Sequence, residues 1–164
     1  MLSIRKPALT ALAVLLIVTV AASPFSSSLK KPIHSVTGSG AAEEEGVRFT
    51  TTIAAHQAED GDVWGTIVVN LDLSAFNVEP LITFRQVVTC VDVDGNSAWI
   101  GGVVTQSNNQ EIIPIGQTTV TLVRDLGSGG QDIMHGEPSA PEVTCLDRPA
   151  FNETVVTHGN YTVR

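Results

Sequence analysis

The segment formed by residues 87–104, VVTCVDVDGNSAWIGGVV, constrains the fold of this chain more than any other. Apolar and β-branched residues, which favour extended structure, lie on both sides of the turn Asp94-Gly95-Asn96. Glycine and asparagine tolerate the positive φ that a tight hairpin turn requires. The segment therefore predicts two antiparallel strands. The first contains Cys90, and Gly101 and Gly102 predict a bulge or a close backbone approach in the second.

The chain after residue 46 predicts further strands. Residues 47–56 alternate between apolar and polar side chains, as a half-buried strand does. Turn residues separate other short apolar or β-branched segments, at 63–71, 84–93, 97–105, 118–125, 131–135 and 143–146, with a small hairpin at 154–164. No helix is expected here. About seven to eight such strands favour an all-β fold, either an antiparallel sandwich or a small barrel.

The first 46 residues predict two segments outside this domain. Arg5 and Lys6 precede the apolar run 8–20, and small residues follow at 21–23, as in a helical secretory signal peptide at 1–23. The run is short for a membrane span, which needs about 20 residues. An N-terminal membrane anchor that is not cleaved is the alternative. Residues 24–46 are rich in serine, glycine, proline and charge, which predicts a flexible arm. The single domain is then expected at 47–164.

The charge of the chain limits its partners. The formal net charge is −8 at pH 7, so no positive surface is expected. Nucleic acids and anionic membranes both require one, and neither is an expected partner. We expect an exported protein, extracellular or periplasmic, whose partner is an unknown protein or carbohydrate, with no membrane contact beyond the export signal.

Cys90 and Cys145 are the two cysteines of the chain. In an exported protein an even number of cysteines favours a disulfide, and closing a loop of this length stabilises by about 4 kcal/mol in the chain-entropy model. Two buried free thiols are the alternative. There is no C-x-x-C motif, so redox catalysis is not expected.

Residues 88–102 match the core V-T-C-x-x-x-x-G-N-x-A-x-x-G-G. This core resembles that of a family of small, uncharacterised exported bacterial proteins. A D-x-G-x-G-like loop at 125–129, the second cysteine and G-N-x-x-V at 159–163 extend the resemblance over residues 47–164. It implies export and a β-rich fold, and it implies no activity. The family loop often carries an acidic residue where this chain has Ser128, which weakens any metal role for it.

Asp92, Asp94 and Asn96 have the spacing of the first ligands of a calcium loop, because a hard cation needs several oxygens close together. The rest of such a loop is missing, since Ser97 stands at the position of the usual glycine and Val103 at that of the final glutamate. A plain hairpin turn is therefore favoured over a metal site. Turn chemistry also explains the acidic stretch at 59–62.

No other motif assigns a catalytic residue, a metal ion or a cofactor. There is no G-x-S-x-G elbow, and the glycine-rich stretch 127–130 lacks the lysine of a phosphate loop. None of the four histidines has a partner at zinc-ligand spacing: His34, His56, His135 and His158.

Trp64 and Trp99 are the remaining ligand-binding candidates, because two exposed indoles can stack on a sugar, although packing between strands is the more ordinary role. The sequence favours a non-catalytic binding or surface-interaction module, contacted through the long connections at 106–117 and 126–141. A small secreted hydrolase whose site is assembled only in the fold is the alternative. A structural component of the cell envelope is a third possibility.

Overall fold

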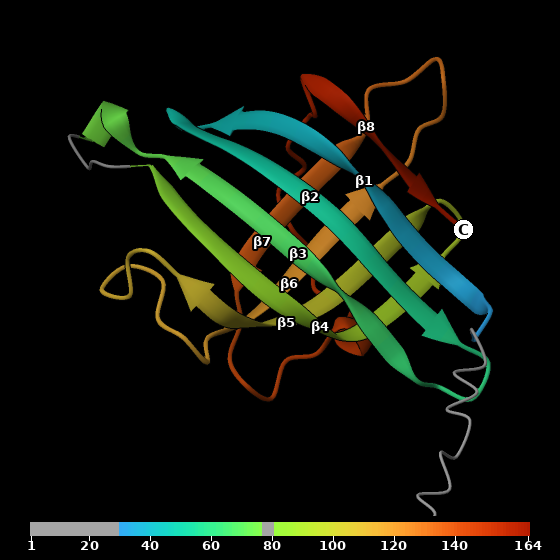
Figure 1. The fold of residues 1–164 in the computed structure, drawn as a ribbon. Helices are drawn as coiled ribbons and strands as arrows, with labels where there is room; N and C mark the ends of the chain where they lie inside the picture. The colour runs from blue at the N-terminus through green and yellow to red at the C-terminus, as the bar shows by residue number, and fades with distance from the viewer. Residues whose placement is uncertain (1–29, 77–80) are drawn as a thin grey trace, which may run out of the picture.

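A computed structural model describes residues 30–76 and 81–164. The predicted signal peptide at 1–23 lies outside the described residues. Eight antiparallel strands form one curled sheet, a half-barrel, in the order β7-β6-β5-β4-β3-β2-β1-β8. In Figure 1, β1, β2 and β3 cross in front of β5, β6 and β7. The all-β prediction is confirmed, as one curled sheet and not as two packed layers.

Short turns join β1 to β2, β2 to β3 and β4 to β5, and the other four connections are longer. Their bounds are β1 (Pro32–Glu44), β2 (Val47–Ala58), β3 (Val63–Asp72), β4 (Ile82–Asp94), β5 (Ser97–Ser107), β6 (Thr118–Arg124), β7 (Ile133–Pro138) and β8 (His158–Val163). Two 3₁₀ turns, η1 (Ser74–Phe76) and η2 (Cys145–Asp147), are the only helical elements in the described part of the chain.

The predicted central hairpin is confirmed as β4 and β5. Asp94 pairs with Ser97 across the turn, and Gly95 has φ +60°, as the turn chemistry requires. The register shifts between Val88 and Cys90, which marks a bulge in β4. A Cβ on Gly101 would lie 2.5 Å from Cys90 Sγ, so the glycine permits the close approach of the cysteine.

Strand β1 corrects the prediction of a flexible arm at 24–46, which is wrong for residues 32–44. This strand lies between β2 and β8, so the domain begins before residue 47. Glycines in this segment made it look like a linker, but two of them are required for packing against β8. Gly38 has φ +147°, and a Cβ there would lie 2.2 Å from the Asn160 carbonyl oxygen. A Cβ on Gly40 would lie 2.8 Å from the ring of Tyr161, so both glycines make room for β8.

The C-terminal quarter differs from the predicted strands in three places. Cys145 begins the η2 turn and is not in an extended segment; Asp147 caps that turn by accepting a 2.6 Å hydrogen bond from the Thr144 amide. Residues 136–138, which follow the strand predicted at 131–135, continue β7. Residues 154–164 do not form a hairpin, because β8 pairs with β1 while Val155 bridges to Ile133 of β7.

Two aspartates connect the two edges of the curled sheet, which are formed by β7 and β8. Asp132, 3% exposed, accepts hydrogen bonds from the amides of Leu126 (3.0 Å) and Tyr161 (2.6 Å). Asp125 accepts one from the Val163 amide at 3.2 Å. These bonds connect the loop before β7 to β8. We call this the closed end of the half-barrel.

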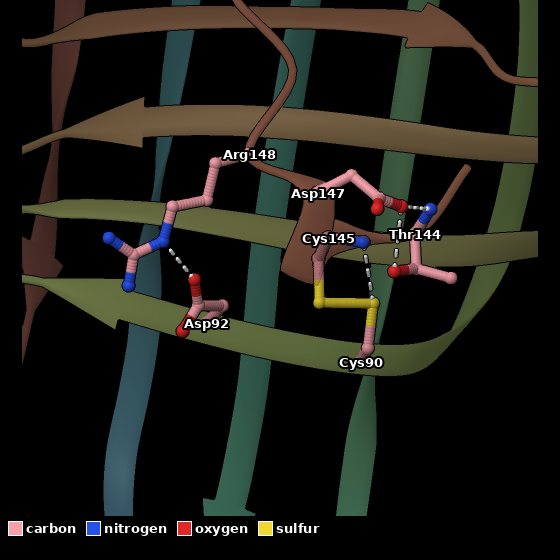
Figure 2. The surroundings of a disulfide bond; sticks show 6 residues. All are labelled: Cys90, Asp92, Thr144, Cys145, Asp147 and Arg148. Carbon is pink, nitrogen blue, oxygen red and sulfur yellow. Dashed lines mark hydrogen bonds and ion pairs between the residues drawn. A yellow bond between two sulfur atoms is a disulfide. The ribbon is translucent and has the colours of Figure 1, made fainter.

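The sheet packs on both faces. The concave face holds the main core, to which most strands contribute aliphatic side chains, among them Val36, Ile53, Ile67, Val88, Ile100, Val123 and Tyr161. The convex face of β4 and β5 is covered by the η2 segment, which the Cys90–Cys145 disulfide attaches to β4 (Figure 2). The disulfide prediction is confirmed, with the two Cα atoms 6.0 Å apart.

Candidate functional site

The half-barrel contains a cavity of about 340 Å³ on its concave side. Its lining comes from the β1–β2 turn, η1, the β5–β6 connection and the facing halves of β2, β3, β4, β6 and β7. Figure 1 shows the β1–β2 turn, η1 and the β5–β6 connection gathered at the left end of the molecule. This is the end opposite Asp132, and we call it the open end.

The walls of the cavity are apolar. Side chains on one face of a strand recur at every second residue, and the inward positions of β2 and β3 place Phe49 and Val69 in the wall. The other apolar wall residues are Val47, Leu71, Phe76, Phe84, Ile113, Met134 and Pro138. Such a surface favours a ligand with an apolar body.

Four polar side chains at the inner end of the cavity form what we call the polar floor. Thr51, Gln86, Thr119 and Thr121 are 4%, 2%, 8% and 5% exposed. Thr119 Oγ1 donates a 2.7 Å hydrogen bond to Gln86 Oε1. Gly102 makes room for this pair, since a Cβ there would lie 2.5 Å from Gln86 Oε1.

The polar floor retains unused hydrogen-bonding capacity. The bond from Thr119 uses Oε1 of Gln86 and not its amide nitrogen, and Thr51 and Thr121 line the same cavity. Gln117 also lines the cavity, and its buried Oε1 has no hydrogen-bond partner among the described residues. Buried polar groups are normally paired, so the unpaired Gln117 Oε1 indicates a site that a polar ligand atom or water completes.

The outer rim of the cavity carries three glutamates, Glu44, Glu45 and Glu137, which we call the acidic mouth. His135 lies between two of them, with Nε2 2.7 Å from Glu137 Oε1 and Nδ1 3.2 Å from Glu44 Oε2. No lysine or arginine is present among the described lining residues. The potential at the mouth is therefore negative, whether or not the histidine is protonated.

His135 is held from several sides. Its ring is 7% exposed and stacks on Phe151 with the ring centroids 5.3 Å apart. Thr154 Oγ1 lies 3.3 Å from Nδ1 and donates a 2.8 Å hydrogen bond to Glu44. The histidine thus links β7 to β1 and to the segment before β8. Its lone position in the sequence gave no sign of these partners.

The calcium-loop candidates lie away from the cavity, on the convex face. The Arg148 guanidinium pairs with Asp92 (Figure 2) and, at 2.7 Å, with Asp94. Asn96 donates a 2.9 Å hydrogen bond to the Asp125 carbonyl oxygen. The cationic partner of the two aspartates is thus a side chain of this protein. In the acidic turn at 59–62, Asp60 and Asp62 pair with Lys30.

Neither tryptophan lines the cavity. Both indoles are half-buried, and each has a neighbour. Trp64 stacks on His56 at 5.4 Å between ring centroids, and Trp99 donates a 3.1 Å hydrogen bond to the Pro149 carbonyl oxygen. Arg148 lies over the Trp99 ring, 5.3 Å from its centroid. Their role in ligand binding stays a prediction.

The two connections predicted to carry contacts both contribute to the cavity. Residues 106–117 supply Ile113 and Gln117, and residues 126–141 supply the lining part of β7. The polar floor was missed. Its signal was present in the sequence, because Gln86 interrupts the apolar face of β4.

Within the described ranges, no helix is long and apolar enough to span a membrane. Comparison of the chain with family models, with curated proteins and with solved structures finds no match. The cavity and its chemistry therefore carry the functional argument.

Proposed function

We propose that this protein is an exported, non-catalytic binding module that takes a small, largely apolar molecule into the cavity of its half-barrel. The observation that carries the proposal is the combination of apolar walls with the polar floor in about 340 Å³. Ligand sites are mostly apolar pockets of roughly 300–1,000 Å³ in which a few polar groups orient the ligand. An apolar cavity of roughly 150 Å³ already binds benzene.

This proposal differs from a surface-interaction module in the place of binding. The ligand binds inside the half-barrel and not on the outer loops. The walls are preformed by strands of a hydrogen-bonded sheet, so little ordering opposes binding. Export is part of the same proposal. The Cys90–Cys145 disulfide is typical of an oxidising compartment, and the signal-like sequence at 1–23 supports transport to one.

The test uses N-phenyl-1-naphthylamine, an uncharged dye whose fluorescence rises in apolar surroundings, titrated with the purified protein. We expect saturable binding. Thr121→Leu adds apolar volume to the inner end of the cavity and should weaken dye binding at least about tenfold, which corresponds to 1.4 kcal/mol. Thr50→Leu is the matched control, because Thr50 lies in β2 with its side chain exposed on the face opposite to that of the buried Thr51.

Two results would contradict the cavity as the binding site. One is a dye signal that does not saturate. The other is equal dye affinity in Thr121→Leu and Thr50→Leu, which would place the dye on the surface. Thermal unfolding of both variants checks that the fold is retained.

A second candidate, a small hydrolase, is favoured by one observation. His135 lines the cavity, and Glu44 beside Nδ1 would orient the ring as in a general base when Nε2 is released from Glu137. Hydrolysis of 1-naphthyl acetate by the wild type, lost in His135→Gln while dye binding is kept, would support this candidate. Equal, buffer-level rates for both proteins would dismiss it.

A further inference from the structure

We infer that the ligand is an uncharged amphipathic molecule that enters with a hydroxyl or carbonyl group first and leaves its apolar body along the walls. This inference rests on the proposed function and adds the chemical class and the orientation of the ligand. It follows from the separate positions of the polar floor, the apolar walls and the acidic mouth.

The polar floor sets the chemistry of the inner group. Gln86 is 2% exposed, and its Oε1 is already occupied by Thr119, so its amide nitrogen remains as a donor. The hydroxyls of Thr51 and Thr121 can each donate or accept. A ligand hydroxyl or carbonyl would satisfy these groups, whereas a hydrocarbon would leave them without a hydrogen-bond partner.

The same floor rejects a charged inner group. Every described floor residue is neutral, and burying a charge without an opposite charge is far more costly than burying a hydrogen-bonded hydroxyl. The floor therefore selects a neutral polar group.

The acidic mouth acts against anions in particular. A carboxylate or sulfonate that entered the cavity would pass Glu44, Glu45 and Glu137 and would meet no lysine or arginine among the described lining residues. Repulsion between like charges at the rim of an apolar cavity is screened less than in bulk water. Fatty acids and other anionic amphiphiles are therefore disfavoured, although their apolar parts fit the walls.

Three naphthalenes that differ in one substituent test the inference by displacement of N-phenyl-1-naphthylamine. They are 2-naphthol with a hydroxyl, naphthalene with no polar group, and 2-naphthoate with a carboxylate. We expect 2-naphthol to displace the dye at about tenfold lower concentration than naphthalene, as one net hydrogen bond predicts. We expect 2-naphthoate to be weaker than 2-naphthol by at least about tenfold.

Two sets of variants assign these differences to the floor and the mouth. Gln86→Met combined with Thr119→Val removes both partners of the floor hydrogen bond and should reduce the advantage of 2-naphthol over naphthalene severalfold, with Thr51 and Thr121 supplying the remainder; Thr50→Val is the control. Glu45→Gln combined with Glu137→Gln should strengthen 2-naphthoate severalfold relative to 2-naphthol. Glu142→Gln, an exposed change outside the cavity lining, is the matched control.

The possible failures are separable. If the dye itself does not bind in the cavity, the proposed function is wrong. If the dye binds there and 2-naphthoate competes as well as 2-naphthol, or 2-naphthol competes no better than naphthalene, the ligand class is wrong while the cavity remains a binding site. Because each comparison is a ratio within one protein, a uniform loss of affinity in a variant does not imitate either result.

Discussion

The closed and open ends of the half-barrel use the same strands but fill their interior differently. Along the β6–β7 pair, Val123 lies opposite Met134 toward the closed end, and Thr119 lies opposite Pro138 toward the open end. Tyr161 fills the closed end and is completely buried. The hollow at the open end is thus produced by the choice of side chains on continuous strands. Stability should depend mainly on the closed end, and binding on the open end.

The largest expected effect is the loss of the Tyr161 ring. Its hydroxyl donates to the Thr51 carbonyl oxygen at 2.8 Å, and its ring packs against Gly40. Tyr161→Ala should cost about 3–5 kcal/mol of unfolding free energy, as for other large buried aromatics. Phe49→Ala at the open end should cost about 1–2 kcal/mol, because this partly buried ring already borders a cavity.

Urea unfolding of both variants, analysed with a common slope, measures this contrast. Equal losses would mean that the two ends contribute alike, and the comparison would fail. If Tyr161→Ala does not fold, Tyr161→Phe provides the test, with an expected loss of about 1 kcal/mol for one buried hydrogen bond.

Removal of the disulfide is the next largest change. Cys90→Ser combined with Cys145→Ser should destabilise the protein by about 2–4 kcal/mol, mainly by releasing a loop of 55 residues in the unfolded chain. Reduction of the wild type should have the same effect and should not affect the variant. Dye affinity of the folded variant should be unchanged, because the disulfide lies on the convex face. A parallel loss of affinity would show that this face shapes the cavity.

The sequence predicted the fold class well because alternation and turn residues report which face of a strand is buried. The hairpin of β4 and β5 and the pairing of Cys90 with Cys145 follow from such local signals. Strand β1 was missed for a physical reason. Its glycines are needed for packing against Tyr161, whose position more than a hundred residues later cannot be read from composition.

The candidate site was less predictable than the fold. Gln86 and Thr119 become one feature only because β4 and β6 both flank β5 and face inward. His135 gains Glu44 from β1 in the same way, whereas Glu137 lies two residues away on its own strand. By contrast, Asp92 and Asp94 share a local motif, and that motif binds Arg148. Local spacing correctly predicted the turn between β4 and β5. The cavity could not be predicted in this way, because pairing between distant strands brings its lining residues together.

A pH titration tests the closed end without a mutation. Burial raises the pKa of Tyr161 above its ordinary value of 10.0. Because the folded pKa is the higher one, the stabilising contribution is complete below pH 10.0 and is lost as the pH rises toward the folded value. Tyr161 is the one tyrosine of the chain, so ultraviolet absorbance of the phenolate reports it alone. We expect phenolate to appear only together with unfolding; its appearance near pH 10.0 in a protein with native circular dichroism would contradict a dry closed end.

The smallest expected effect belongs to Asp72, where β3 leads into η1 at the open end. Hydrogen bonds from Ser74, first from its side chain and then from its backbone, lower the pKa of Asp72 below 3.8. The lowered value means that ionised Asp72 favours the folded turn above pH 3.8 and that this contribution is lost as the pH falls through the folded value. Ser74→Ala should raise the Asp72 pKa toward 3.8, measured by nuclear magnetic resonance of the carboxyl carbon, with Ser128→Ala as the control. Because this carboxylate is exposed, the urea midpoint should barely move. A midpoint shift comparable to that of Phe49→Ala would show that the η1 turn, and not only the wall, holds the open end together.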